Sequence, residues 1–276
     1  MFEYRQATAL ITGASSGIGE AFAFALARRG VSLILVARTK PKLDELAKRL
    51  GHEHGIQATV IEADLAERNA PERLHARVAD LGLRVDLLVN NAGFTLSGDF
   101  LSHDLSQEEQ QLHVDVGALI GLAHFFVKDM VARKQGAVIN LASITSFMPI
   151  THSAVYGASK SFVLSFSEAL AREVAGTGVR VLALCPGPVA SGFYDRIGVN
   201  PPRTLLATPE RVVAEALSAL DRGRSVVVAG GSMIRMLAFG TRLLPRSINV
   251  RIGERIGRQY FVNDKKAVSA PSQTTR

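Results

Sequence analysis

Short runs of apolar residues alternate along the chain with longer stretches in which apolar and polar positions follow a helical spacing. Most of the short runs are apolar without interruption, which is typical of parallel strands covered on both faces. The alternation predicts an α/β fold in which a doubly wound parallel sheet carries helices on both sides. About seven strands are expected, at residues 7–12, 31–37, 57–63, 85–90, 136–143, 179–185 and 225–230.

The composition fits a globular protein with a sizeable core. The 276 residues are 47% hydrophobic and 21% charged, and no apolar run is long enough to predict a membrane-spanning helix. The first residues lack the basic start and the cleavage site of a signal peptide. The only cysteine, Cys185, lies in an apolar strand, which predicts a buried structural thiol. Together these features predict a cytoplasmic protein.

The net charge of +7 raises the hypothesis of a nucleic-acid partner. The basic residues are dispersed except near the end of the chain, and no basic run is interleaved with aromatic residues. Ligand spacings typical of zinc sites are also missing from the sequence. An anionic small ligand and a basic C-terminal segment explain the charge better, so we predict neither a nucleic-acid partner nor a metal.

A glycine-rich turn, "TGASSGIG" at residues 12–19, follows the first predicted strand and opens a helix. Gly13 permits a tight turn, Gly17 allows a pyrophosphate to approach the backbone, and Gly19 allows the helix to lie close to the strand. The free N–H groups at the start of a helix suit a phosphate. This strand–turn–helix context predicts a Rossmann-type dinucleotide-binding fold, although the spacing of the glycines differs from G-x-G-x-x-G.

Five motifs occur together in one order: the glycine turn, "NNAG" (90–93), Ser143 in "NLAS", "YGASK" (156–160) and "PGPV" (186–189). In order and spacing they resemble the short-chain dehydrogenase/reductase family over about residues 5–230. The resemblance implies a single catalytic domain over residues 1–230, with a substrate loop at about 190–208. The cofactor-binding residues it implies are Gly13, Ser15, Ser16, Gly17, Ile18, Gly19, Arg38, Asp64, Leu65, Asn90, Asn91, Ala92, Gly93, Tyr156, Lys160, Pro186, Gly187 and Val189.

The residue after the second predicted strand indicates which cofactor binds. An acid there would bind the ribose 2′-hydroxyl of NAD, but this sequence has Arg38. A guanidinium pairs with a 2′-phosphate through charge-assisted hydrogen bonds, so NADP(H) is predicted. Asp64, after the third strand, resembles the residue that holds the adenine; alternatively it caps the next helix, or it does both.

Tyr156 and Lys160 are four positions apart, which places both on one face of a helix. Tyr156 is predicted to exchange a proton with a carbonyl oxygen that Ser143 holds, and the ammonium of Lys160 is expected to lower the pKa of the phenol. The resemblance also implies that Lys160 binds the nicotinamide ribose. We therefore predict NADPH-dependent reduction of an apolar ketone or aldehyde, or the reverse oxidation. The alternative is a non-enzymatic regulatory protein that binds NADP(H).

The sequence departs from the family in "HVDVGA" (113–118), where Asp115 stands at the position of an Asn that holds a water linked to the catalytic Lys. An ionised Asp115 is expected to lie near Lys160 and to raise the pKa of Tyr156. His152 is either a substrate contact or an ordinary loop histidine.

Residues 231–276 form a basic amphipathic extension that ends in a loose tail. The part over residues 231–262 is predicted to be a lid over the substrate, a contact with a partner subunit, or a contact with an anionic membrane. The family resemblance implies a homodimer or a homotetramer. Thr208 and Pro209 predict the start of a helix. The substrate loop is expected to supply an apolar lining from Phe193, Tyr194, Ile197, Leu205 and Leu206.

Overall fold

The structure is a computed structural model that describes residues 2–199 and 206–261. Its centre is a sheet of seven parallel strands in the order β3-β2-β1-β4-β5-β6-β7, which confirms the predicted fold. All seven predicted strands are present, with ends that differ by one or two residues. The strands are β1 (Thr8–Thr12), β2 (Ser32–Ala37), β3 (Ala58–Glu62), β4 (Leu87–Asn90), β5 (Gly136–Leu141), β6 (Val179–Pro186) and β7 (Val226–Ala229).

The strand β1 lies inside the sheet, third in the order, because the chain crosses from one half of the sheet to the other between β3 and β4. It pairs with β2 on one side and with β4 on the other. The connections that follow β1 and β4 run over opposite faces of the sheet. Ligands of doubly wound sheets bind at this point, beyond the carboxyl ends of the strands. The sheet order thus places the glycine turn and "NNAG" side by side.

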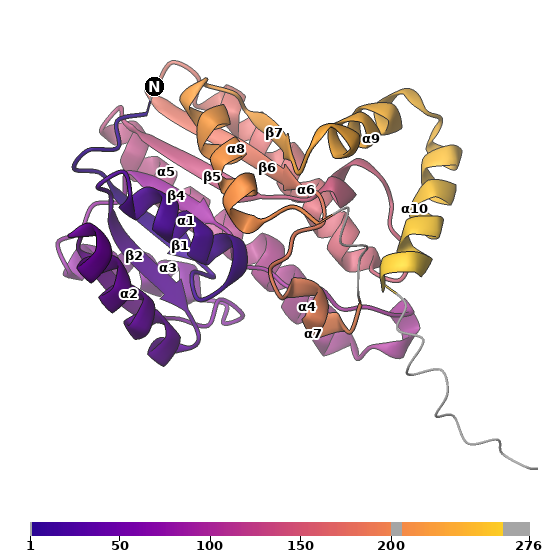
Figure 1. Ribbon diagram of the computed structural model, residues 1–276, viewed down its shortest axis with the longest axis horizontal. Helices are drawn as coiled ribbons and strands as arrows, with labels where there is room; N and C mark the ends of the chain where they lie inside the picture. Colours follow the sequence, from indigo (N-terminus) through magenta and orange to yellow (C-terminus); the bar gives the residue numbers. More distant parts are fainter. Residues whose placement is uncertain (1, 200–205, 262–276) are drawn as a thin grey trace, which may run out of the picture.

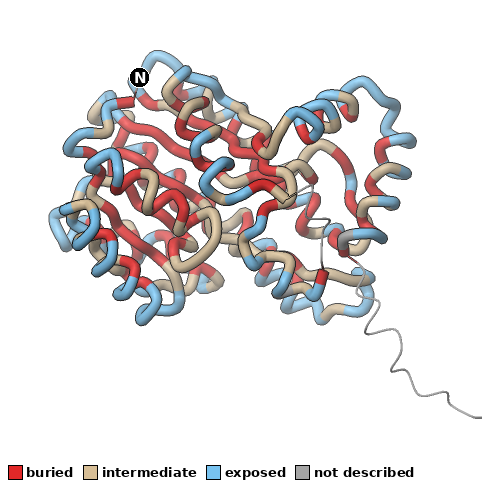
Figure 2. Tube along the Cα trace, viewed as in Figure 1, coloured by how far each residue is buried: buried red, intermediate tan, exposed pale blue. Residues whose placement is uncertain are grey.

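Helices cover both faces of the sheet (Figure 1). Alternate residues of β1 point to opposite faces: Ile11 belongs to a core with α1, α2 and α8, and Leu10 to a second core with α3 and α5. Figure 2 shows the inner strands largely buried and the outer faces of these helices exposed, while the edge strands β3 and β7 are mostly half-buried. The helices are α1 (Gly17–Ala27), α2 (Lys40–His54), α3 (Ala70–Asp80), α4 (Leu105–Leu112), α5 (Leu119–Ala132), α6 (Ala154–Glu173), α7 (Phe193–Ile197) and α8 (Pro209–Asp221).

Two predicted local features are confirmed. Thr208 is the N-cap of α8, where its hydroxyl accepts a hydrogen bond from the Arg211 N–H at 3.3 Å. Cys185 is fully buried in β6, and burial raises the pKa of its thiol to about 12. A thiol in this state is a packing group rather than a nucleophile.

The extension beyond β7 contains two helices, α9 (Ser232–Leu243) and α10 (Arg246–Phe261). They stand beyond the edge of the sheet, at the right of Figure 1, with α9 beside β7 and α10 farther out. No helix in the described part of the chain is long and apolar enough to cross a membrane. Leu205 and the predicted loose tail from Asp264 lie outside the described residues. The boundary at residue 230 stays a prediction.

Candidate active site

A cavity of about 560 Å³ extends over the carboxyl ends of the strands, from the segment after β3 to the end of β5. Its size is within the range of sites for small molecules and cofactors. Thirteen of the predicted cofactor residues line it: Gly13, Ser15, Ser16, Gly17, Ile18, Arg38, Asp64, Leu65, Asn91, Ala92, Gly93, Tyr156 and Lys160.

The glycine turn has the backbone that a phosphate cradle needs. Gly13 and Gly17 have φ angles of 65° and 60°, which L side chains rarely adopt. A Cβ at Gly17 would lie 2.9 Å from the side chain of Ser191. At Gly19 a Cβ would overlap the carbonyl oxygen of Gly13, so this glycine lets α1 begin close to β1. The turn therefore fits a dinucleotide pyrophosphate at the start of α1.

Asn91 ties this turn to the end of β4. Its side-chain amide donates to the carbonyl oxygen of Thr12 at 2.9 Å, and the Thr12 hydroxyl accepts from the N–H groups of Asn91 and Ala92 at 2.9 and 3.0 Å. These contacts fix the distance between the two walls of the cavity.

Two cations lie where β2 ends. Arg38 and Lys42 are exposed and line the same end of the cavity. Lys42, on the first turn of α2, was not among the predicted cofactor residues. Asp64 also lines this end, and its carboxylate accepts from the Ala66 N–H at 3.0 Å. The alternative that Asp64 caps the next helix is wrong, because Asn69 holds the N-cap position of α3.

A second, apolar cavity of about 290 Å³ adjoins the first. Five residues line both cavities: Ile18, Leu141, Tyr156, Ser191 and Phe193. Ser143 and Tyr194 also line the second cavity, as do residues of α9 and α10 that the sequence analysis did not single out individually. Those residues are Met233, Ile234, Leu237, Ile256, Gln259 and Phe261.

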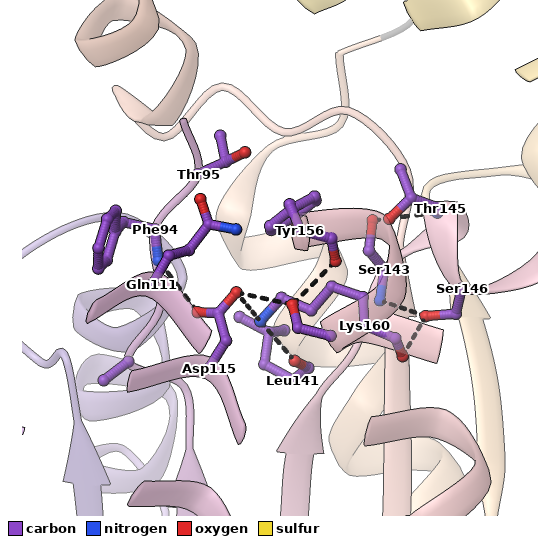
Figure 3. Close-up of polar contacts among 12 residues, drawn as sticks. Phe94, Thr95, Gln111, Asp115, Leu141, Ser143, Thr145, Ser146, Tyr156 and Lys160 are labelled. Carbon is purple, nitrogen blue, oxygen red and sulfur yellow. Dashed lines mark hydrogen bonds and ion pairs between the residues drawn. The ribbon is translucent and has the colours of Figure 1, made fainter. Parts of the chain in front are cut away.

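Ser143 and Tyr156 meet at the junction of the two cavities. Ser143 follows β5 and caps the short helix η3 (Ile144–Phe147), with its hydroxyl accepting from the Thr145 N–H at 3.2 Å. The Ser143 hydroxyl is near enough to the phenol of Tyr156 to lower the pKa of that phenol. Both residues of the predicted carbonyl-binding pair line the second cavity, and Figure 3 shows them together with Lys160 and Asp115.

Lys160 lies one turn after Tyr156 on α6, as predicted, and its ammonium is buried. The Nζ atom donates to the Leu141 carbonyl at 3.2 Å and lies 3.7 Å from Oδ2 of Asp115 (Figure 3). Asp115 is fully buried in a π-helical turn, η2 (His113–Ala118), that joins α4 to α5. Such turns are frequent at functional sites, and this one brings Asp115 to the ammonium.

The carboxylate of Asp115 has three partners. Besides the ammonium, it accepts from the Phe94 N–H at 3.2 Å and from the Ser159 hydroxyl at 3.1 Å. Burial raises the pKa of Asp115, while Lys160, Ser159 and Phe94 oppose that rise. The expectation that Asp115 lies beside Lys160 is confirmed.

The predicted fall in the pKa of Tyr156 is wrong for this structure. Burial raises the pKa of the phenol above its ordinary value, Asp115 raises it further, and the hydrogen bond with Ser143 opposes the rise. The ammonium of Lys160 lies 5.5 Å from the centre of the phenol ring and is paired with Asp115. The carboxylate of Asp115 therefore offsets most of the effect that the ammonium would have on the pKa of the phenol.

Several predicted residues do not line the first cavity. Asn90 is buried and donates to the side chain of Asn140 at 3.0 Å, so it holds β4 to β5. Gly19 serves the close approach described above, and Leu206 lines neither cavity. Pro186, Gly187 and Val189 line the second cavity.

His152 also lies outside the lining of both cavities, and its Nδ1 lies 2.8 Å from Asp99 Oδ1. Its φ of 58° marks a turn, which favours the interpretation as a loop histidine.

Comparison with known proteins decides the family. The model of the short chain dehydrogenase family matches residues 7–200. The chain is a member of this family. A 7beta-hydroxysteroid dehydrogenase from Clostridium sardiniense is 32% identical over 215 residues, which cover 77% of this chain and 82% of that protein.

Two solved structures are also similar. A short-chain dehydrogenase from Sphingobium yanoikuyae in complex with NADPH has 30% identity and a TM-score of 0.78, covering 98% of this chain and all of that one. A bulky-bulky ketone specific alcohol dehydrogenase from Comamonas testosteroni has 32% identity and a TM-score of 0.73, covering 81% and 86% of the two chains. This family member is therefore an oxidoreductase that acts on CH–OH groups of small molecules with a nicotinamide cofactor.

The charge of Asp115 predicts how oxidation depends on pH. If Tyr156 is the predicted acid/base group, oxidation of an alcohol needs its phenolate, and Asp115 raises the pKa of that phenol. Asp115→Asn removes the negative charge and should lower this pKa, so kcat/KM for the alcohol should begin to rise at lower pH. The measurement is the pH profile of oxidation in both proteins. Asp80→Asn, an exposed carboxylate at the end of α3, is the control. An unchanged profile in Asp115→Asn would remove Asp115 from the proton chemistry.

Proposed function

We propose that this chain reduces an apolar ketone or aldehyde to an alcohol with NADPH, or catalyses the reverse oxidation. The observation that carries the proposal is the position of Tyr156, which lines both the cofactor-sized cavity and the apolar cavity. A proton donor at that junction can reach a substrate in the second cavity. A hydroxysteroid dehydrogenase and a ketone-specific alcohol dehydrogenase among the relatives support an apolar substrate.

The proposed proton steps use four side chains. When bound, the nicotinamide supplies or accepts the hydride. Ser143 donates a hydrogen bond to the carbonyl oxygen, and Tyr156 gives that oxygen its proton. Lys160, held by Asp115 and the Leu141 carbonyl, is placed to bind the nicotinamide ribose and to pass protons toward Tyr156. The raised pKa of Tyr156 keeps the phenol protonated, which suits reduction near neutral pH.

A non-enzymatic NADP(H)-binding regulatory protein is the alternative. Such a protein needs the glycine turn but not an acid/base group at the mouth of a second cavity. The contact between Ser143 and Tyr156 at that mouth therefore favours the enzyme. Binding of NADPH without turnover of any carbonyl in a broad panel would support the regulatory protein instead.

Tyr156→Phe tests the catalytic role. The variant keeps the ring and loses the proton donor, so reductase kcat should fall about 10²- to 10⁴-fold. Binding of NADPH, followed by its fluorescence, should be retained. Tyr4→Phe, the same change in a tyrosine outside both cavities, should keep normal turnover. Near-normal turnover in Tyr156→Phe would exclude Tyr156 as the acid/base group.

The preference for NADP(H) rests on Arg38 and Lys42 at the end of the first cavity. Arg38→Asp replaces an attraction for the 2′-phosphate with a repulsion. Charge-assisted hydrogen bonds contribute about 1.5–3 kcal/mol, so the ratio of NADPH to NADH affinity should fall at least about tenfold. Titration of both cofactors measures the ratio, and Arg222→Asp at the exposed end of α8 is the control. Equal ratios in Arg38→Asp and the wild type would rule this role out.

Residues of α9 and α10 line the second cavity, which favours the lid among the three alternatives for this extension. A homodimer or homotetramer and a cytoplasmic location stay predictions. Contact with an anionic membrane also stays a prediction, supported by exposed apolar side chains on α9 and by the arginines of both helices. The strongly exposed apolar residues of α9 are Met233, Met236, Phe239 and Leu243.

Sedimentation with vesicles tests the membrane contact. If α9 binds an anionic surface, the protein should sediment with phosphatidylserine vesicles at low salt and should be released at high salt. Phe239→Ser should weaken this binding because it removes an exposed apolar side chain. Equal recovery with neutral and anionic vesicles would contradict the prediction.

A further inference from the structure

Four buried residues of α10 follow one another at intervals of four. They are Asn249, Gly253, Gly257 and Phe261. Residues with this spacing lie on one face of a helix and form a ridge along it. The ridge is therefore the face that α10 presents to the rest of the protein.

The two glycines of the ridge allow α10 to touch the backbone of the segment before α6. A Cβ at Gly253 would overlap the carbonyl oxygen of Pro149, and one at Gly257 would overlap the carbonyl oxygen of Thr151. Only glycine permits backbones to approach so closely. The two glycines thus set the distance between α10 and the segment that leads to Tyr156.

The start of α10 is fixed as well. The buried side-chain amide of Asn249 donates to the carbonyl oxygen of Thr241 at 2.7 Å, near the end of α9. A second bond from the same amide reaches the Leu244 carbonyl at 3.4 Å. These bonds hold the angle between the two helices, so α10 is a fixed wall.

Phe261 ends the ridge beside the catalytic tyrosine. Only 4% of its surface is exposed, and its ring centre lies 6.4 Å from that of Tyr156. The ring packs against Met148 and Ile150 and lines the second cavity. Phe193, from the substrate loop, lies 5.8 Å from the same tyrosine. The space next to the phenol is therefore bounded by aromatic rings.

We propose that Phe261 determines specificity by limiting the size of the carbonyl compound that reaches Tyr156, with Gly253 and Gly257 as positioning residues that hold it there. The inference rests on the proposed carbonyl reduction and names the substrate class. A cavity of about 290 Å³ is at the lower end of small-molecule sites. The preferred substrates are apolar ketones small enough to fit beside the Phe261 ring, such as a simple aryl ketone.

The first experiment compares kcat/KM for a simple aryl ketone and for a fused bicyclic ketone. Phe261→Ala removes the ring and should raise the ratio of bicyclic to aryl ketone about tenfold or more. Phe261→Trp, which keeps an aromatic wall and adds bulk, should lower the ratio. Phe162→Ala is the matched control, because Phe162 is 40% exposed on α6 and lines neither cavity. Its ratio should equal that of the wild type.

The second experiment tests the glycines. Gly257→Ala should push α10 away from Thr151 and withdraw Phe261, so KM for the aryl ketone should rise while kcat and NADPH affinity stay near those of the wild type. Gly240→Ala on α9 is the control, because a Cβ at Gly240 would meet no atom within 4 Å. A fall in kcat in Gly257→Ala would refute a positioning role. A change in KM of the same size in Gly257→Ala and in the control Gly240→Ala would also refute it.

The outcomes separate this inference from the proposed function. One outcome is that the wild type turns over both ketones while the wild type, Phe261→Ala and Phe261→Trp all show the same ratio of kcat/KM for the bicyclic ketone to that for the aryl ketone. That result would overturn the inference alone. Failure of the wild type to reduce any ketone of the panel would overturn the proposed function and, with it, the inference. A ratio that rises in Phe261→Ala and falls in Phe261→Trp would support both.

Discussion

All seven strands run in the same direction, so their carboxyl ends meet at a single edge of the sheet. Four parts of the candidate site stand directly after strands and depend on that constraint. The glycine turn leaves the end of β1, Arg38 the end of β2, Asn91 the end of β4 and Ser143 the end of β5. Each of these four strands thus carries a part of the site, and the hydrogen bonds between strands keep those parts at fixed distances.

Within this frame, a buried ion pair sets the electrostatics. Lys160 and Asp115 lie almost wholly out of water, where each charge depends on the other. Because Lys160 is paired with Asp115, it lowers the pKa of Tyr156 much less than the Tyr–Lys spacing suggests. The pKa of the phenol is raised instead. The protonation of Tyr156 and the burial of these two charges are thus linked in one side-chain cluster.

The C-terminal helices complete the site from outside the sheet. The helix α9 comes so close to the loop after β6 that a Cβ at Gly187 would lie 2.9 Å from Ile234. The helix α10 reaches the other side of the second cavity through its glycine ridge and Phe261. The same extension thus supplies apolar walls that the sheet cannot provide, because strands end where the substrate must lie.

The sequence by itself determined the strands, their alternation with helices, the glycine turn and the helix cap at Thr208, since each depends on residues close together in the chain. It also placed Ser143, Tyr156 and Lys160, because strand ends and a four-residue spacing are local signals. Only the tertiary structure decided that Asn90 faces the interior, that the pKa of Tyr156 rises, and that Phe261 closes the cavity. These features depend on how the chain packs: on burial, on the pairing of charges and on the approach of distant backbones. The spacing of residues in the sequence does not predict them.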